Sequence, residues 1–218
     1  ANDQFAVMLY YALFQERIGK LGYANIYEAL HLVERYPLFK QEMIEMMDYL
    51  QENLDFKTYP MDAGISAGLE LYGCYTKEEI FALFGRQTAD KKMQGAASGA
   101  FSIEEKNVEL FFVTLNKSEK DFSPTTQYND YFISENRFHW QSQNSMSHTN
   151  NGARYVNQPS NGRRFILFVR EDKKDGFGNT CPYYCMGLVD YVKSHGNFPM
   201  NIEWQLEKPA IAKFIKAV

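Results

Sequence analysis

The sequence has few cysteines and no long apolar run. Its three cysteines, Cys74, Cys181 and Cys185, are too few for a disulfide framework and favour a reducing, cytoplasmic setting. No stretch approaches the roughly 18 apolar residues that a membrane helix needs, so we expect a soluble protein without membrane contact. The chain opens at Ala1 with neither an initiator Met nor a secretion signal, which is typical of a piece of a longer polypeptide.

The common signatures of catalysis are also missing. There is no phosphate-binding Gly-x-x-x-x-Gly-Lys loop, no Gly-x-Ser-x-Gly elbow and no His-Glu-x-x-His pair. The four histidines are scattered, and Cys181 and Cys185 are not spaced as the Cys-x-x-Cys pair of a zinc site. Adjacent carboxylates such as Glu104 and Glu105 would point to opposite faces of a strand, which is poor for shared acid–base chemistry. We therefore predict that this chain is not an enzyme and holds no metal and no cofactor.

Aromatic residues, by contrast, are abundant. They make up 16% of the sequence, with fifteen tyrosines and seventeen phenylalanines. This abundance favours a β-rich core, because flat rings pack well on a pleated sheet. It also suits stacking on a ligand, although we expect most of these rings to be core.

Charge is unevenly distributed along the chain. The net charge is −4, but residues 1–85 carry six Lys and Arg against thirteen Asp and Glu, whereas residues 86–218 carry seventeen against fourteen. The acidity therefore belongs to the first part, and the second part could present a basic face to phosphates.

Hydrophobic periodicity divides the chain into a helical part and a strand-rich part. Apolar residues at helical spacing predict helices over about residues 5–18, 26–35 and 37–54. Thr76 and Glu79 have the spacing of a capping box, which predicts a short helix over 77–84. Strands are predicted at 101–104, 108–116, 130–134, 138–143, 154–156, 165–171, 183–192 and 202–207, followed by a short helix at 210–216. We therefore expect an α+β fold, with a helical subdomain over 1–62 and a curved β-sheet or β-barrel over 63–218.

A polar and aromatic block follows the first long strand. On a strand, Phe138 and Trp140 share one face, whereas His139, Gln141 and Gln143 share the other. Amide side chains can bond base edges at two points, and aromatic rings can stack on bases. The same face could instead be a sheet surface whose polar groups satisfy one another across the strands. The residues alone leave both interpretations open.

The motifs of this block resemble the C-terminal domain of unknown function of bacterial proteins that combine a phospholipase-D-like nuclease with a superfamily-2 helicase, characterised in SauUSI-type modification-dependent restriction enzymes. The resemblance spans about residues 75–209 and rests on Phe111–Thr126, Tyr128–Tyr131, Phe138–Asn144, Phe168–Glu171, Gly187, Gly196 and Pro199–Met200. It implies an SRA/PUA-like domain that detects 5-methylcytosine or 5-hydroxymethylcytosine in double-stranded DNA. ATP hydrolysis and cleavage would belong to the helicase and nuclease domains of the same polypeptide.

The resemblance also implies that the modified base is flipped into a pocket, stacked on rings and bonded along its pairing edge. Asp130 is our candidate acceptor for the cytosine amino group. The base-binding candidates are Tyr128, Asp130, Tyr131, Trp140, Gln141, Gln143 and Asn144. The phosphate-binding candidates are Lys117, Lys120, Arg137, Arg154, Arg163 and Arg164.

A second hypothesis assigns this chain to protein–protein contact. The acidic, amphipathic first 60 residues would dock on the helicase of the same polypeptide or form a homodimer, without any direct base readout.

Overall fold

The computed structural model describes residues 3–53, 57–62, 64–65, 68–93, 99–117 and 129–215. The chain forms two compact units. The helical unit comprises Ala1–Leu69 and Tyr75–Gly95, and the sheet unit comprises Glu70–Cys74 and Ala96–Val218. The helical unit is thus not one continuous stretch, because the segment from Tyr75 to Gly95 returns to it.

The helical unit is built from short capped helices. Asp3 caps α1 by accepting from the backbone N–H groups of Phe5 and Ala6, and Thr76 and Glu79 form the predicted capping box at the start of α5. A small core joins α1 and α5 around Tyr10, Tyr11 and Ala82. The elements of this unit are α1 (Gln4–Phe14), α2 (Ile18–Leu21), α3 (Ile26–Arg35), α4 (Pro37–Glu52), β1 (Tyr59–Pro60) and α5 (Lys77–Leu83).

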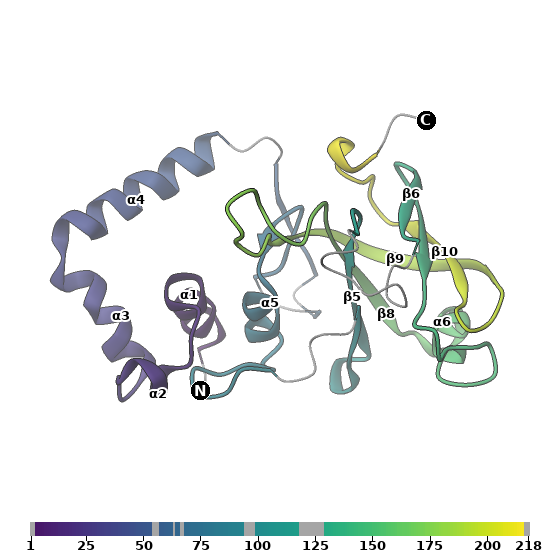
Figure 1. Ribbon diagram of the computed structural model, residues 1–218, viewed down its shortest axis with the longest axis horizontal. Helices are drawn as coiled ribbons and strands as arrows, with labels where there is room; N and C mark the ends of the chain where they lie inside the picture. The colour runs from purple at the N-terminus through teal and green to yellow at the C-terminus, as the bar shows by residue number, and fades with distance from the viewer. Residues whose placement is uncertain are drawn as a thin grey trace. The chain divides into compact units, whose positions relative to one another are not determined.

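The sheet unit contains a mixed sheet with strand order β4-β5-β8-β9-β10-β7-β6, and β3 pairs with β9 as the eighth strand. Figure 1 labels β5, β6, β8, β9 and β10 of this sheet. β5 and β8 run parallel, whereas the other neighbours on the path are antiparallel. The strands are β2 (Glu70–Leu71), β3 (Cys74–Tyr75), β4 (Ala100–Ile103), β5 (Val108–Thr114), β6 (Tyr131–Ser134), β7 (Arg137–Gln141), β8 (Arg164–Arg170), β9 (Tyr183–His195) and β10 (Asn201–Leu206). The short helices are α6 (Ala153–Val156), α7 (Gln158–Asn161) and two 3-10 turns at Glu104–Lys106 and Ala212–Phe214.

The sheet curls around its own aromatic core. The thirteen-residue strand β9 pairs with β8 through its first part and with β10 through its second part. The two halves of the sheet therefore face each other, and the ring of Phe111 on β5 stacks on Trp140 of β7 at 4.5 Å. Trp204 of β10 lies 4.9 Å from Phe165 of β8, between ring centroids. These contacts place the core between β5 and β8 on one side and β7 and β10 on the other.

A glycine at the bend of β9 is favoured by its backbone conformation. Gly187 has φ +82°, and a Cβ there would lie 2.8 Å from Leu71 of β2. It lies next to the register shift between Leu167 and Phe168 of β8. Gly187 thus supplies the left-handed backbone conformation that β9 needs beside this register shift, which residues with a side chain rarely adopt.

The structure confirms the α+β class and corrects two expectations. The sheet path is open, with β4 at one end and β6 at the other, so the alternative of a closed β-barrel is wrong. The strand predicted at 154–156 is also wrong, because these residues form α6, which places Tyr155 in the core. No helix among the described residues is long and apolar enough to cross a membrane.

Candidate nucleic-acid interface

The outer face of β6, β7 and β10 carries the polar half of the predicted block. β7 alternates strictly: Phe138 and Trp140 point into the core, so His139 and Gln141 lie on the opposite face. The register places Tyr131 of β6 opposite His139, and Asn201 of β10 opposite Gln141. Directly opposed residues of antiparallel strands share a face. Tyr131, His139, Gln141 and Asn201 therefore form one surface, which we call the β7 outer face.

Two rings on this face are stacked. The ring centroids of Tyr131 and His139 lie 4.7 Å apart, with an angle of 15° between the planes. His139 is buried, and its Nδ1 donates to the carbonyl oxygen of Asn129 at 2.7 Å, which fixes the orientation of the imidazole. Tyr131 remains 43% exposed. The imidazole thus supports an aromatic ring that is accessible to a planar ligand.

Amide side chains connect the strands at the end of the same face. The Oε1 atom of Gln141 accepts from the backbone N–H of Asn129 at 2.9 Å, and its Nε2 donates to Oδ1 of Asn201 at 3.1 Å. These two bonds fix the amide of Gln141 and assign its oxygen and nitrogen. The second N–H of Gln141 is not used by either bond, so it could serve a ligand.

Asp130 lies directly before β6 and is buried together with Lys117. Their side chains are 4% and 9% exposed, and Nζ of Lys117 lies 2.5 Å from Oδ2 of Asp130. Oδ1 of Asp130 accepts from the backbone N–H of Gln141 at 2.8 Å. Burial raises the pKa of Asp130, while Lys117, the Gln141 N–H and His139 act in the opposite direction. Both carboxylate oxygens are therefore already engaged, and Lys117 would have to share Asp130 with a bound base.

The remaining base-binding candidates lie elsewhere. Trp140 is buried, stacked on Phe111 and in T-shaped contact with Tyr155, so its ring is not accessible to a base. Gln143 is half-buried and Asn144 is exposed, both just beyond β7. Tyr128 lies outside the described residues, as does the phosphate candidate Lys120.

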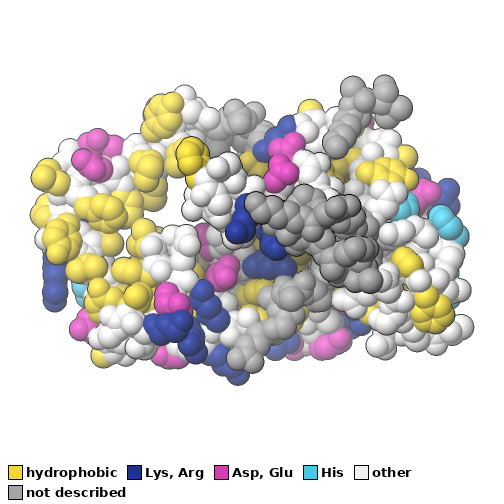
Figure 2. Space-filling view, in the orientation of Figure 1, with side chains coloured by type: hydrophobic (Ala, Val, Ile, Leu, Met, Phe, Trp, Pro, Cys, Tyr) yellow, Lys and Arg dark blue, Asp and Glu magenta, His cyan; other side chains and the backbone are white. Residues whose placement is uncertain are grey.

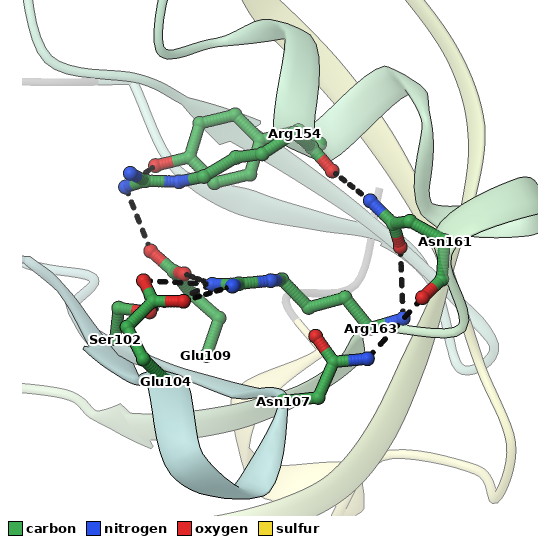
Figure 3. A network of polar contacts seen from close by, with 8 residues as sticks. Ser102, Glu104, Asn107, Glu109, Arg154, Asn161 and Arg163 are labelled. Atoms are coloured by element: carbon green, nitrogen blue, oxygen red, sulfur yellow. Dashed lines mark hydrogen bonds and ion pairs between the residues drawn. The ribbon is translucent and has the colours of Figure 1, made fainter.

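Two phosphate candidates, Arg154 and Arg163, are held by a buried carboxylate (Figure 3). Glu109 of β5 is fully buried, and its two oxygens accept from Nη2 of Arg154 at 2.8 Å and from Nη1 of Arg163 at 3.0 Å. Arg163 also donates to Ser102 at 2.7 Å and pairs with Glu104. Burial raises the pKa of Glu109, whereas Arg154 and Arg163 lower it. We call this group the Glu109 network, and a phosphate would have to compete with its carboxylates for either arginine.

The last two phosphate candidates are half-buried arginines at strand starts. Arg137 opens β7 and lies opposite Gln205 of β10, on the outer face. Arg164 opens β8 in the other half of the sheet. The structure thus brings together Lys117, Asp130, Tyr131 and Gln141, and separates them from the Glu109 network. Within the described residues, no three His, Cys, Asp or Glu side chains gather as metal ligands.

The site includes three residues that the sequence-based candidates omit. For His139 the sequence does carry a signal: strand alternation places this residue on the polar face, where it can support a stacking ring. Asn129 and Asn201 act through their hydrogen bonds to His139 and Gln141. Asn201 is sixty positions beyond Gln141, and only the β10–β7 pairing reveals it.

Comparisons with known proteins give a family and a distant likeness to solved structures. The family model "Domain of unknown function (DUF3427)" matches residues 69–216. Among solved structures, "The 5-Hydroxymethylcytosine-Specific Restriction Enzyme AbaSI" is similar with a TM-score of 0.40 and 14% identity. That likeness covers 80% of this chain and 55% of the other, so the chain spans about half its length. No curated protein matches.

Proposed function

This chain belongs to the DUF3427 family, and we propose that its sheet unit is the DNA-recognition part of a multidomain helicase–nuclease, which binds a modified cytosine flipped out of a duplex. The observation that carries the proposal is the β7 outer face, where an exposed tyrosine ring, a supporting imidazole and two fixed amides lie together. In this proposal the chain itself cuts nothing, and helicase and nuclease activities belong to other domains.

The β7 outer face has the groups that a flipped base requires. A base out of the stack is held by aromatic surface and by hydrogen bonds to its pairing edge. Tyr131 supplies the surface, and the stack on His139 holds its ring in one orientation before any base arrives. The second N–H of Gln141, which its bonds to Asn129 and Asn201 do not use, can bond a base acceptor such as the cytosine carbonyl. A preorganised site of this kind loses little side-chain entropy on binding.

Asp130 supplies the complementary acceptor for the exocyclic amino group of cytosine. Its backbone is next to Tyr131, and Oδ1 already accepts one bond from the N–H of Gln141. A carboxylate oxygen can accept two hydrogen bonds, so a base donor can be added without breaking this one. The charge of Lys117 favours the ionised form of the buried carboxylate, which is the form that accepts, against the effect of burial on its pKa.

The proposal is tested by binding to three otherwise identical duplexes, which carry cytosine, 5-methylcytosine or 5-hydroxymethylcytosine at one position. We expect tighter binding to a modified duplex at modest salt, measured by fluorescence anisotropy. Tyr131→Ala should reduce that preference about tenfold, because stacking on one aromatic side chain contributes about 1–3 kcal/mol per base. Tyr27→Ala removes an exposed tyrosine of α3 and serves as the matched control. Equal binding to all three duplexes by the unaltered chain would contradict the proposal.

A second candidate function, docking on another protein domain, is favoured by α4. This sixteen-residue helix has no buried residue, although Phe39, Met43, Met46 and Leu50 recur at the 4-3-4 spacing of a helix-packing stripe. Hydrophobic side chains gather over α3 and α4 in Figure 2. An isolated helix of this length is marginal in water, so its apolar stripe is expected to be covered.

Charge indicates what covers α4. The helix carries four acidic residues, Glu42, Glu45, Asp48 and Glu52, against Lys40 alone. Like charges would oppose pairing with a second copy, whereas an apolar groove rimmed by Lys and Arg would be complementary. We therefore assign α4 to a basic-rimmed groove on the helicase domain that the sequence resemblance implies.

Met46→Glu is expected to weaken binding of this chain to that helicase domain at least tenfold, while binding to DNA is unchanged. The charge would enter the apolar stripe and remain without a partner. Ile44→Glu, about 160° around the helix from Met46, is the control and should leave both affinities unchanged. Calorimetry measures the affinity, and sedimentation velocity measures the mass of the chain alone. A dimer that Met46→Glu dissociates would make a second copy the occupant instead.

A further inference from the structure

The loop between β9 and β10 presents an aromatic ring to solvent. Phe198 is 63% exposed, and no ring contact with another described residue is found for it. Its φ is +58°, in the left-handed region that residues with a bulky side chain rarely adopt. A surface position that needs this φ would ordinarily be a glycine or an asparagine. An exposed phenylalanine there is both strained and poorly placed for stability, which suggests that the ring has a function.

Hydrogen bonds on both sides hold the loop in place. Before Phe198, Oδ1 of Asn197 accepts from the backbone N–H of His148 at 2.9 Å and from its ring Nδ1 at 3.0 Å. Phe198 itself donates its N–H to the carbonyl oxygen of Met146 at 2.9 Å. After it, Met200 and Ser142 are joined by two bonds of 2.9 Å, one from each backbone N–H. The backbone under the ring is therefore fixed to the segment that follows β7.

This segment brings Phe198 to the end of the β7 outer face. β10 begins at Asn201, three residues after Phe198, and Asn201 pairs with Gln141. The loop and the predicted base-reading groups thus lie at the same end of β7 and β10. A DNA strand that delivered a base to Tyr131 and Gln141 would pass close to this loop.

We propose that Phe198 is a wedge, whose ring enters the base stack of duplex DNA at the position that the flipped cytosine leaves. The inference rests on the proposed function and adds the residue that opens the duplex. Flipping a base leaves a gap between its two neighbours, and apolar side chains that enter a base step compensate for the lost stacking. A rigid loop suits this role, because the ring is already ordered before it enters the DNA.

A second exposed phenylalanine provides a matched control. Phe177 is 94% exposed at the tip of the β8–β9 loop, where Oδ1 of Asp175 accepts from the N–H groups of Phe177 and Asn179 at 2.9 and 2.8 Å. Both phenylalanines are therefore solvent-exposed on ordered loops. Phe177 precedes β9 and Phe198 follows it, so they lie at opposite ends of a thirteen-residue strand.

The test uses a duplex with one 5-methylcytosine and 2-aminopurine as the base next to it on the same strand. The fluorescence of 2-aminopurine rises when it no longer stacks on a neighbouring base. We expect binding of the unaltered chain to increase this fluorescence, and Phe198→Ala to remove most of the increase and weaken binding about tenfold. Phe198→Leu should keep most of both, since leucine can also act as a wedge. Phe177→Ala should behave like the unaltered chain.

A second duplex separates a wedge from a merely structural residue. In it the 5-methylcytosine faces an abasic site, so no base pair has to be opened. On this duplex Phe198→Ala should bind within about twofold of the unaltered chain, whereas a damaged fold would weaken binding to both duplexes. Phe198→Gly should be at least as resistant to heat as the unaltered chain, because glycine adopts this φ without strain.

The outcomes distinguish the wedge from the proposed function. If the unaltered chain prefers the modified duplex and Phe198→Ala retains both its affinity and the fluorescence increase, the wedge is overturned while DNA reading stands. If Phe177→Ala loses the fluorescence increase instead, the wedge belongs to the β8–β9 loop and the assignment to Phe198 is wrong. If the unaltered chain shows no preference for modified cytosine, the proposed function is wrong, and the wedge that rests on it is overturned with it.

Discussion

Glu109→Gln is expected to lower the free energy of unfolding by about 3 kcal/mol, because it removes the carboxylate of a buried ion pair: Arg154 loses its ion-pair partner, while Arg163 still pairs with Glu104. Glu109 is the only carboxylate that contacts both Arg154 and Arg163 among the described residues. An amide of the same shape keeps the volume but turns one N–H group toward a guanidinium. Urea unfolding followed by tryptophan fluorescence measures the effect, because both tryptophans, Trp140 and Trp204, lie in the core of the sheet unit.

Glu104→Gln is the matched control for this prediction. Glu104 also pairs with Arg163, but its side chain is 68% exposed. Ion pairs in contact with water contribute at most about 1 kcal/mol, so the control should change stability by less than that. Equal effects of the two substitutions would show that burial of Glu109 is not what makes the network important.

The Glu109 network also limits what charge counting can predict. The excess of Lys and Arg over residues 86–218 is compatible with a basic face, and Arg154 and Arg163 are among the predicted phosphate contacts. The carboxylate that they share, Glu109 of β5, is 45 positions from Arg154 and 54 from Arg163 along the chain. A sequence shows the arginines but not the strand pairing that turns Glu109 toward them. In the β-rich part, a Lys or Arg side chain can therefore be assigned to a DNA phosphate only after its carboxylate partners in the fold are known.

Local rules predicted the elements that are decided locally. The helices α1, α3 and α4 and the capping box of Thr76 and Glu79 are confirmed, because caps and helical periodicity act within a few residues. The strand predicted at 154–156 is wrong, because three residues are too few to show a period. Closure of the sheet is non-local, so the sequence could not choose between a curved sheet and a barrel. The parallel pairing of β5 with β8 likewise depends on tertiary packing.

The same reasoning predicts part of the candidate site from the sequence. Alternation along β7 correctly separated Phe138 and Trp140 from His139 and Gln141. Alternation does not show which of the two faces packs into the core, and the prediction of Trp140 as a stacking residue is therefore wrong. The decision depends on Phe111, which comes from another strand and covers the indole. A periodic pattern thus sorts residues by face, and only packing identifies the accessible face.

Asp130→Asn is expected to abolish the preference for modified cytosine and to lower the free energy of unfolding by about 3 kcal/mol. The loss of stability follows because Lys117 would be left charged and 9% exposed, without its carboxylate. The loss of preference follows because the amide replaces one acceptor oxygen of the carboxylate with an NH2 group, which cannot accept from the amino group of the base. Duplex binding and urea unfolding measure the two effects separately.

Lys117→Met separates the structural role of the pair from base reading. The methionine can replace the aliphatic part of the lysine, and the remaining carboxyl group, whose pKa burial already raises, can take up a proton instead of remaining charged. A native-state pKa raised above the unfolded value makes stability decrease as pH rises, so the deficit of this variant should shrink between about pH 7 and about pH 5. The deficit of Asp130→Asn should not shrink in this way, because that variant has no carboxyl group at position 130. At about pH 7, Lys117→Met should keep more of the preference for modified cytosine than Asp130→Asn does. The reverse order would assign the base contact to Lys117 and leave Asp130 as its support.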